Sequence, residues 1–356
     1  MFPHETYIRR CFQLARKGEG FVAPNPMVGA VIVHNNTIIG EGYHRKYGEA
    51  HAETHAIKAV KNASLLPKST LYVSLEPCSH YGKTPPCAEL IVAHRIPRVV
   101  VAVADPNPKV SGKGIQMLRD SGVEVVVGVL EDEARRLIKR FFVNHILRRP
   151  YVVLKWAQSS DGFIDRERAS FEELPPVCLS NNITQVLAHK LRTEVQAILV
   201  GTRTALMDNP QLTARKWFGT NPTRIVIDKD NKLPPDLVIF NVAAPTFVFS
   251  ASDPNDSQRK ENVTHISIDF AKNVVEQILQ HLFDRNIVSL LVEGGAKTLS
   301  SFIEKNVWDE AFIEIADTPL LSGVKSPNIK GVTVETQRFS TSLRIRLENK
   351  TTRNFI

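Results

Sequence analysis

The 356-residue sequence has no uninterrupted apolar run of membrane-spanning length, which argues against a transmembrane helix. Its opening residues, MFPHETYIRR, lack the apolar stretch of a secretory signal, so we expect a cytoplasmic protein. Only four cysteines are present, and in a chain of this size they do not suggest a disulfide framework. We find neither an internal repeat nor a low-complexity stretch.

Negative charge is in deficit, since 45 lysines and arginines outnumber 37 aspartates and glutamates and leave a formal charge of +8. This excess suits an anionic ligand. It would also suit RNA, but no basic run carries interleaved aromatic residues, so we expect neither a nucleic-acid nor a membrane partner. A hydrophobic content of 43% is ordinary for a globular protein, and the length suffices for two domains with separate cores.

Two segments of the first half carry residue types that bind catalytic zinc: His51-Ala-Glu53 and Pro77-Cys78, the latter followed by Cys87. One imidazole and two thiolates leave the fourth zinc position open, and a carboxylate beside them can transfer protons. An H-x-E element followed by P-C is typical of zinc nucleobase deaminases. Cysteines alone are more often buried and inert, but the combination favours a metal site. We predict one zinc ion per chain, held by His51, Cys78 and Cys87, with Glu53 as the proton-transferring group.

The surrounding pattern predicts alternating strands and helices. An apolar run at 69–75 predicts a strand leading to Cys78, and helices are expected to begin near His51 and Cys87, where the helix dipole favours a thiolate. Asn35-Asn36 between two apolar runs predicts a hairpin. Pro150 disfavours helix at the residue before it, so we place a domain boundary there. The expected elements are strands at 29–34, 37–42, 69–75, 99–104 and 123–129, and helices at 51–62, 87–94 and 131–147.

The second half also reads as α/β. Its Glu293-Gly-Gly-Ala-Lys segment joins a strand to a helix, and such a turn is equally consistent with a phosphate cradle and with a simple tight turn. It is not a G-x-G-x-x-G dinucleotide fingerprint. The expected elements are strands at 151–155, 197–201, 223–228, 245–250, 289–292, 309–316 and 342–348, and an amphipathic helix at 274–283.

Several motifs together resemble one family, the bifunctional pyrimidine deaminase/reductases of riboflavin biosynthesis. In the first half these are the segment 23–30 (APNPMVGA), the eight residues between Cys78 and Cys87, and the segment 105–108 (DPNP). In the second half, three blocks at 155–162, 200–215 and 292–295 resemble the reductase domain. The resemblance covers nearly the whole chain and implies an α/β fold: a cytidine-deaminase-like α/β/α zinc domain at 1–148 and a dihydrofolate-reductase-like domain at 149–356. It implies NADPH as the second cofactor and a small-molecule phosphoribosyl pyrimidine as the substrate.

The resemblance also implies roles position by position. It leaves Lys155 either facing the sugar or in the seam between the domains. Where the family often carries tryptophan, this chain carries Cys178. The implied cofactor positions are Ala157, Thr204, Asp208, Gly295, Ala296, Lys297, Thr298, Leu299, Ser300 and Ser301. The implied substrate positions are Arg192, Leu212, Arg215 and Glu293 in the second domain and Asn25, His44, His80 and Asp105 in the first.

We therefore predict a bifunctional enzyme that deaminates 2,5-diamino-6-(5-phosphoribosylamino)pyrimidin-4-one and then reduces its ribosyl group to ribityl. We expect a homo-oligomer. One alternative is a nucleoside or tRNA zinc deaminase whose C-terminal half is a non-catalytic module. Another is a nucleic-acid-binding protein, suggested by the positive charge alone.

Overall fold

The computed structural model describes residues 3–81, 85–107, 110–170, 174–254 and 260–356. It divides the chain into two compact units, Met1–Arg148 and Arg149–Phe355, which we describe separately. Within the described residues, no helix has the length and apolar character needed to cross a bilayer.

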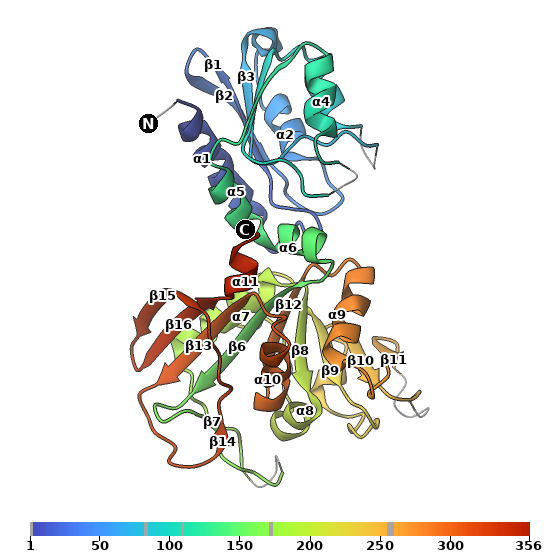
Figure 1. Ribbon diagram of the computed structural model, residues 1–356, viewed down its shortest axis with the longest axis vertical. Coiled ribbons are helices and arrows are strands. Elements are labelled where there is room, and N and C mark those ends of the chain that lie inside the picture. The colour runs from blue at the N-terminus through green and yellow to red at the C-terminus, as the bar shows by residue number, and fades with distance from the viewer. Residues whose placement is uncertain (1–2, 82–84, 108–109, 171–173, 255–259) are drawn as a thin grey trace. The chain divides into compact units, whose positions relative to one another are not determined.

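The first unit contains a five-stranded sheet in the order β2-β1-β3-β4-β5 (Figure 1). β1 is antiparallel to β2 and β3, whereas β3, β4 and β5 run parallel. The β1–β2 hairpin turns at Asn35 and Asn36, whose φ angles of 47° and 61° suit the left-handed conformation that asparagine tolerates. The strands are β1 (Gly29–His34), β2 (Thr37–Tyr43), β3 (Thr70–Val73), β4 (Arg98–Val101) and β5 (Glu124–Val127).

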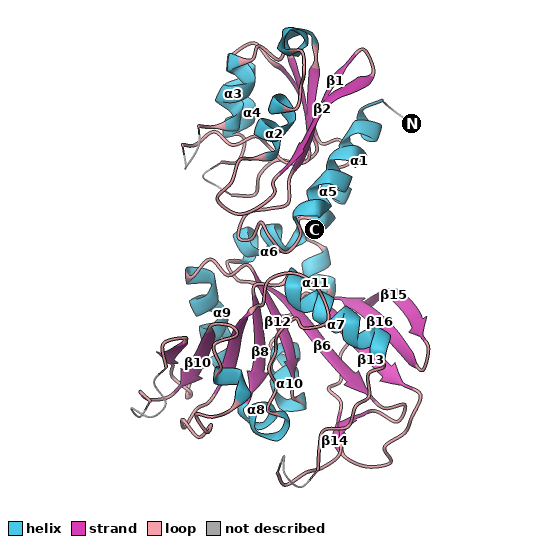
Figure 2. Cartoon of the chain, turned by 180° about the vertical axis from the view of Figure 1, so that it is seen from behind, coloured by secondary structure: helices cyan, strands magenta, loops and turns pink. Residues whose placement is uncertain are grey.

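Helices cover both faces of this sheet, which makes an α/β/α layer structure (Figure 2). Side chains alternate along β1: Val31 and Val33 join the core under α1, α5 and α6, while Ala30 and Ile32 join the core under α2, α3 and α4. The helices are α1 (Pro3–Ala15), α2 (Ala52–Lys58), α3 (Cys87–Ala93), α4 (Lys113–Asp120), α5 (Glu131–Leu137) and α6 (Lys139–Leu147).

The second unit contains a nine-stranded sheet in the order β11-β10-β9-β8-β12-β6-β13-β16-β15. Seven strands are parallel, and β16 and β15 extend the sheet antiparallel at one edge. A short separate pair joins β7 (Phe163–Asp165) to β14 (Val324–Lys325). The sheet strands are β6 (Tyr151–Gln158), β8 (Ala197–Gly201), β9 (Thr223–Ile227), β10 (Thr246–Ser250), β11 (Val263–Ser267), β12 (Ser289–Gly294), β13 (Glu310–Ala316), β15 (Val332–Phe339) and β16 (Ser342–Glu348).

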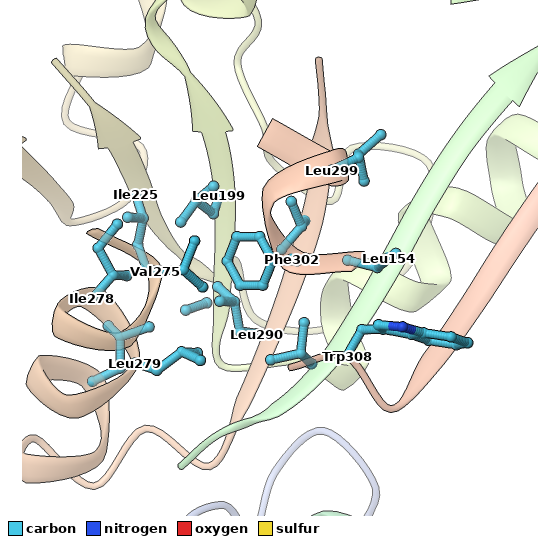
Figure 3. Packing of buried hydrophobic residues seen from close by; sticks show 14 of the residues in the cluster. Leu154, Leu199, Ile225, Val275, Ile278, Leu279, Leu290, Leu299, Phe302 and Trp308 are labelled. Atoms are coloured by element: carbon cyan, nitrogen blue, oxygen red, sulfur yellow. The ribbon is translucent and has the colours of Figure 1, made fainter. Parts of the chain in front are cut away.

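One face of this sheet packs against α9 and α10. Figure 3 shows Leu279 of α9 and Phe302 of α10 meeting Leu290 of β12 in a continuous apolar cluster. The opposite face, which carries Lys155 of β6 and Phe312 of β13, lies against α7. The helices are α7 (Asn182–Glu194), α8 (Thr202–Asp208), α9 (Val274–Asp284), α10 (Ala296–Glu304) and α11 (Lys350–Arg353).

The α/β class predicted from the sequence is confirmed, with several differences in the elements. The single helix expected at 131–147 is two helices, because Ile138 leaves helical geometry (φ −110°, ψ 30°) and its side chain enters the core. The helix expected at 51–62 ends at Lys58. The strands β7, β11, β14 and β15 and the helix α4 were not predicted.

Candidate active sites

Three side chains of the first unit converge at the ends of separate elements. His51 is the residue before α2, Cys87 is the first residue of α3, and Cys78 lies in the loop that follows β3. His51 Nδ1 lies 3.5 Å from Cys78 Sγ and 3.4 Å from Cys87 Sγ. The Cys87 backbone N–H donates to Cys78 Sγ at 3.3 Å. The structure therefore brings together the three residues that the sequence predicts as metal ligands.

The spacing of these atoms fits zinc. Bond lengths of about 2.3 Å to sulfur and about 2.0 Å to nitrogen, at a tetrahedral angle, separate the two ligand atoms by about 3.5 Å. A hydrogen bond from Cys87 lowers the pKa of Cys78 to about 4, and the hydrogen bond that His51 donates to Cys78 raises the pKa of His51 to about 9. The cluster thus stabilises a thiolate, the form of cysteine that binds metals.

Glu53 occupies the second position of α2 and is 3% exposed. Burial raises the pKa of its carboxyl group, while the nearby imidazole of His51 opposes that rise. A raised pKa suits a carboxyl group that both accepts and returns a proton near neutral pH.

Asn25 and His44, two predicted substrate positions, lie together beside the metal cluster. The His44 ring meets the His51 ring edge-on at 5.4 Å. Its Nδ1 lies 3.2 Å from the Ala50 carbonyl oxygen, which can only accept, so Nδ1 carries the proton. Nε2 is then the acceptor for Asn25 Nδ2 at 3.2 Å. Burial lowers the pKa of His44, which keeps this ring neutral and fixes the orientation of the Asn25 amide.

The other two predicted positions of this site differ in exposure. Asp105 is buried, and burial raises its pKa to about 6, with the charges of Glu76 and Cys78 adding to the effect. His80 is exposed in the segment between the two thiols. Residues 82–84 of that segment, and Pro108 of the 105–108 motif, lie outside the described residues.

Sequence reasoning missed Glu76, which precedes Pro77-Cys78. Its carboxylate is 4% exposed and accepts backbone N–H groups of Asp105, Gly112, Gly114 and Ile115 at 2.9–3.3 Å. Glu76 therefore fixes the start of α4 and Asp105 relative to the loop that carries Cys78. The only feature of the sequence that could have indicated this role is the position of Glu76, a charged residue directly after the apolar run at 69–75.

The predicted cofactor positions of the second unit gather where the chain changes direction across the sheet. The connection after β8 leads away to β9, whereas the connection after β12 leads past β6 to β13, so the neighbours β8 and β12 form a switch point. Ligands of open α/β sheets bind at the carboxyl ends of strands at such points. A Cβ added at Gly201 would lie 2.5 Å from Thr298 Oγ1, and one at Gly295 would lie 3.0 Å from Thr204 Oγ1. Larger side chains at these two glycines would displace the threonines of α8 and α10, which approach closely here.

Asp208, another predicted cofactor position, is engaged by an arginine that the sequence did not single out. Arg168 Nη2 lies 2.5 Å from both Asp208 Oδ1 and Asp165 Oδ2. Burial raises the pKa of Asp208, and the hydrogen bond from Arg168 opposes that rise. Cys178 is exposed and accepts an N–H from Gln185 at 3.3 Å.

Two predicted substrate positions form a buried ion pair. Arg192 of α7 binds Glu293 of β12 through two hydrogen bonds of 3.0 and 2.7 Å, and their side chains are 13% and 10% exposed. Burial alone would raise the pKa of Glu293, but the charge and hydrogen bonds of Arg192 and the charge of Lys155 bring it below its usual value. Lys155 faces a narrow space under α7 that Thr184, Phe312 and Arg344 also line, and its role stays a prediction.

Leu212 and Arg215 lie in a strained segment that follows α8. Asn209 and Leu212 both have left-handed backbone (φ 39° and 55°), and for leucine this conformation is uncommon. The segment directs the Thr213 carbonyl to Arg192 Nη1 at 3.0 Å. Arg215 is exposed and hydrogen-bonds Gln211 and Thr213 through Nη1 alone. Within the described residues, no carboxylate pairs with its guanidinium.

Comparison with known protein families finds a separate match in each half of the chain. Residues 1–103 match the model of the cytidine and deoxycytidylate deaminase zinc-binding region, and residues 150–353 match the RibD C-terminal domain. The riboflavin biosynthesis protein RibD of Aquifex aeolicus is 40% identical over 88% of this chain and 86% of its own length. The RibD protein of Bacillus amyloliquefaciens is also 40% identical, over 91% of this chain and 87% of its own length.

Solved structures extend the similarity to the fold. A diaminohydroxyphosphoribosylaminopyrimidine deaminase/5-amino-6-(5-phosphoribosylamino)uracil reductase from Thermotoga maritima superposes with a TM-score of 0.87 at 35% identity. The superposition covers 98% of this chain and 99% of the Thermotoga maritima chain. RibD of Acinetobacter baumannii superposes with a TM-score of 0.86 at 30% identity, covering 97% of this chain and 98% of its own length.

Fold, ligand cluster and switch point thus define a two-domain enzyme, a zinc deaminase joined to a reductase that uses a nicotinamide cofactor. The chain belongs to the RibD family of bifunctional deaminase/reductases of riboflavin biosynthesis. The two expected activities are therefore confirmed, and neither alternative function is needed.

Proposed function

We propose that this chain deaminates 2,5-diamino-6-(5-phosphoribosylamino)pyrimidin-4-one and then reduces the ribosyl side chain of the aminouracil product to ribityl with NADPH. The observation that carries the proposal is the His51–Cys78–Cys87 cluster, whose 3.4–3.5 Å spacing fits a tetrahedral metal. We further propose residues 1–148 as the deaminase domain, residues 149–356 as the reductase domain, and a homo-oligomer as the active form.

In the deaminase site we assign one zinc ion per chain to His51, Cys78 and Cys87. When bound, the ion supplies Lewis-acid chemistry at its open fourth position. Glu53 takes one proton from the attacking water and passes it to the ring nitrogen, and it then moves the proton of the added hydroxyl group to the departing amine. The fixed amide of Asn25 and the neutral ring of His44 orient the pyrimidine, and Asp105 and His80 complete the substrate contacts.

In the reductase site we assign the cofactor to the crevice between the ends of β8 and β12. Free N–H groups at the start of α10 (residues 296–298) suit the cofactor phosphates, and the rest of the segment 295–301, with Ala157, Thr204 and Asp208, supplies the other contacts. Arg215 has hydrogen-bonding capacity left for the substrate phosphate, since guanidinium binds phosphate through two parallel hydrogen bonds. Arg192, Glu293, Leu212 and Lys155 surround the ribosyl group.

Turnover of the diaminopyrimidinone with and without NADPH tests both activities. We expect ammonia release in both reactions and loss of nicotinamide absorbance only when NADPH is present. Ammonia release without any NADPH oxidation would contradict the reductase half of the proposal. Equal oxidation of NADH would contradict the choice of NADPH.

Replacing Gly295 with valine should weaken NADPH binding by roughly 5- to 150-fold, because forcing methyl groups into a filled space costs about 1–3 kcal/mol. A Cβ here already lies 3.0 Å from Thr204 Oγ1, and two further methyl groups would occupy the crevice. Gly295→Ala is the graded control, since the Thr204 side chain can rotate away from a single methyl. Cofactor titration gives the affinities, and ammonia release should be unchanged. Wild-type NADPH affinity in Gly295→Val would leave the Gly-Gly turn a purely structural feature.

Arg215→Ala should raise the substrate KM of the reduction step at unchanged NADPH affinity. Loss of a hydrogen bond to a charged group costs about 1.5–3 kcal/mol, which corresponds to roughly 10- to 150-fold. Steady-state reduction at saturating NADPH measures the effect. Arg203→Ala is the matched control, because this arginine hydrogen-bonds the Arg168 carbonyl instead. An unchanged KM in Arg215→Ala would show that the phosphate lies elsewhere.

A further inference from the structure

His189 of α7 is a buried polar side chain with no role in the contacts described so far. It is 7% exposed, and its Nδ1 atom is buried without a hydrogen-bond partner among the described residues. Nearly all buried polar side-chain atoms in folded proteins are hydrogen-bonded, so such an atom needs a reason.

The position of His189 on α7 places it at the substrate site. Arg192 is three residues further along and therefore on the same side of the helix. The segment after Arg215 runs along this side: Lys216 Nζ donates to Gln185 Oε1, and a Cβ added at Gly219 would lie 2.8 Å from Thr193. The loop thus meets α7 both before and after His189, and Arg215 enters from the same loop.

The charges around His189 are mostly positive. Arg192, Arg215 and Lys216 act on it from the helix and the loop, and Glu293 is the opposing carboxylate. Glu293 is already bound to Arg192, which leaves the charges of Arg215 and Lys216 uncompensated by a carboxylate among the described residues. Burial, followed by the charges of Arg192 and Arg215, lowers the pKa of His189 to about 4. The ring is therefore neutral above pH 5 and carries one N–H donor.

The buried environment also indicates which nitrogen holds that proton. An orphaned buried N–H is rarer in proteins than an under-satisfied acceptor, so the unpartnered Nδ1 is best explained as the unprotonated nitrogen. Nε2 then carries the hydrogen and is the atom left to donate to a ligand.

We propose that His189 is a phosphate-binding residue of the reductase site, where its Nε2–H donates to a phosphate oxygen of the phosphoribosyl substrate beside Arg192 and Arg215. This inference rests on the proposed function. A neutral donor adds a directional hydrogen bond without adding a fourth positive charge to the cluster. It would make the site selective for the phosphorylated substrate.

The test compares His189→Leu, which has similar bulk and no donor, with His189→Gln, whose amide restores an N–H. Ribose 5-phosphate serves as a binding probe that requires no turnover. We expect His189→Leu to raise its Kd by roughly 10-fold or more, the usual consequence of losing a hydrogen bond to a charged group. His189→Gln should recover most of that loss. Binding of ribose, which lacks the phosphate, should not change in either variant.

Reduction assays add a second readout. His189→Leu should raise the substrate KM by a similar factor at nearly unchanged kcat, and the factor should be constant between pH 6 and pH 8, because the ring is neutral throughout. An unchanged Kd for ribose 5-phosphate, or equal losses for ribose and its phosphate, would overturn the role of His189. Absence of NADPH-dependent reduction in the wild type would overturn the proposed function instead, and the ribose 5-phosphate result would still decide the role of His189.

Discussion

Glu53→Gln is expected to lower the deamination rate by at least ~10²-fold while zinc content and fold are retained. Glutamine has nearly the same volume as glutamate, so the buried position in α2 stays filled. The amide cannot accept the proton of the attacking water, and it cannot return that proton to the leaving amine. Ammonia release at saturating substrate, together with zinc content by elemental analysis, measures the two quantities separately.

Glu89→Gln is the matched control for this substitution. Glu89 also lies in the first turn of a helix of the same unit, and its carboxylate accepts a hydrogen bond from Tyr81. It should deaminate at the wild-type rate. Normal deamination by Glu53→Gln would show that another group transfers the proton, and loss of zinc from that variant would make Glu53 a ligand.

The parts of the fold that could be predicted are those determined by neighbours in sequence. The Asn35-Asn36 turn depends on two residues that tolerate positive φ, and the buried strands β8 and β12 are continuous apolar runs bounded by turn residues. β15 was missed because it lies at the sheet edge, where most of its side chains are exposed and no apolar pattern marks it. The break at Ile138 was missed because packing of that side chain overrides a continuous helical pattern.

The same distinction holds for the sites. The candidate zinc ligands could be predicted because residue type and spacing alone indicate a metal site. Helices begin at or next to His51 and Cys87, as predicted. The Arg192–Glu293 pair joins residues 101 positions apart, and no local pattern separates a buried arginine from a solvated one on α7. His189 and Glu76 were missed for the same reason. Their significance lies in which distant backbone and side-chain groups surround them.

Cys87→Ala is expected to remove most of the zinc and to reduce deamination to background. Two ligands remain, and Cys78 also loses the thiol whose hydrogen bond lowers its pKa. Since metal binding contributes to folding free energy, the melting temperature of the deaminase unit should fall as well. NADPH-dependent reduction of the aminouracil product should persist, because every residue assigned to that site lies in the second unit.

The matched control is Cys11→Ala, which removes a thiol of the same unit that is buried in the core and donates to the Tyr72 carbonyl at 3.4 Å. Burial raises the pKa of Cys11 and keeps it a thiol, so this variant should hold a full equivalent of zinc even if its stability falls. Zinc per chain after dialysis against a chelator separates the two variants. A Cys78/Cys87 double variant that still holds one zinc would overturn the assignment of the metal to this cluster. The water-activating chemistry would then have to lie with other residues, and the 3.4–3.5 Å spacing of His51 and the two thiols would be a feature of packing alone.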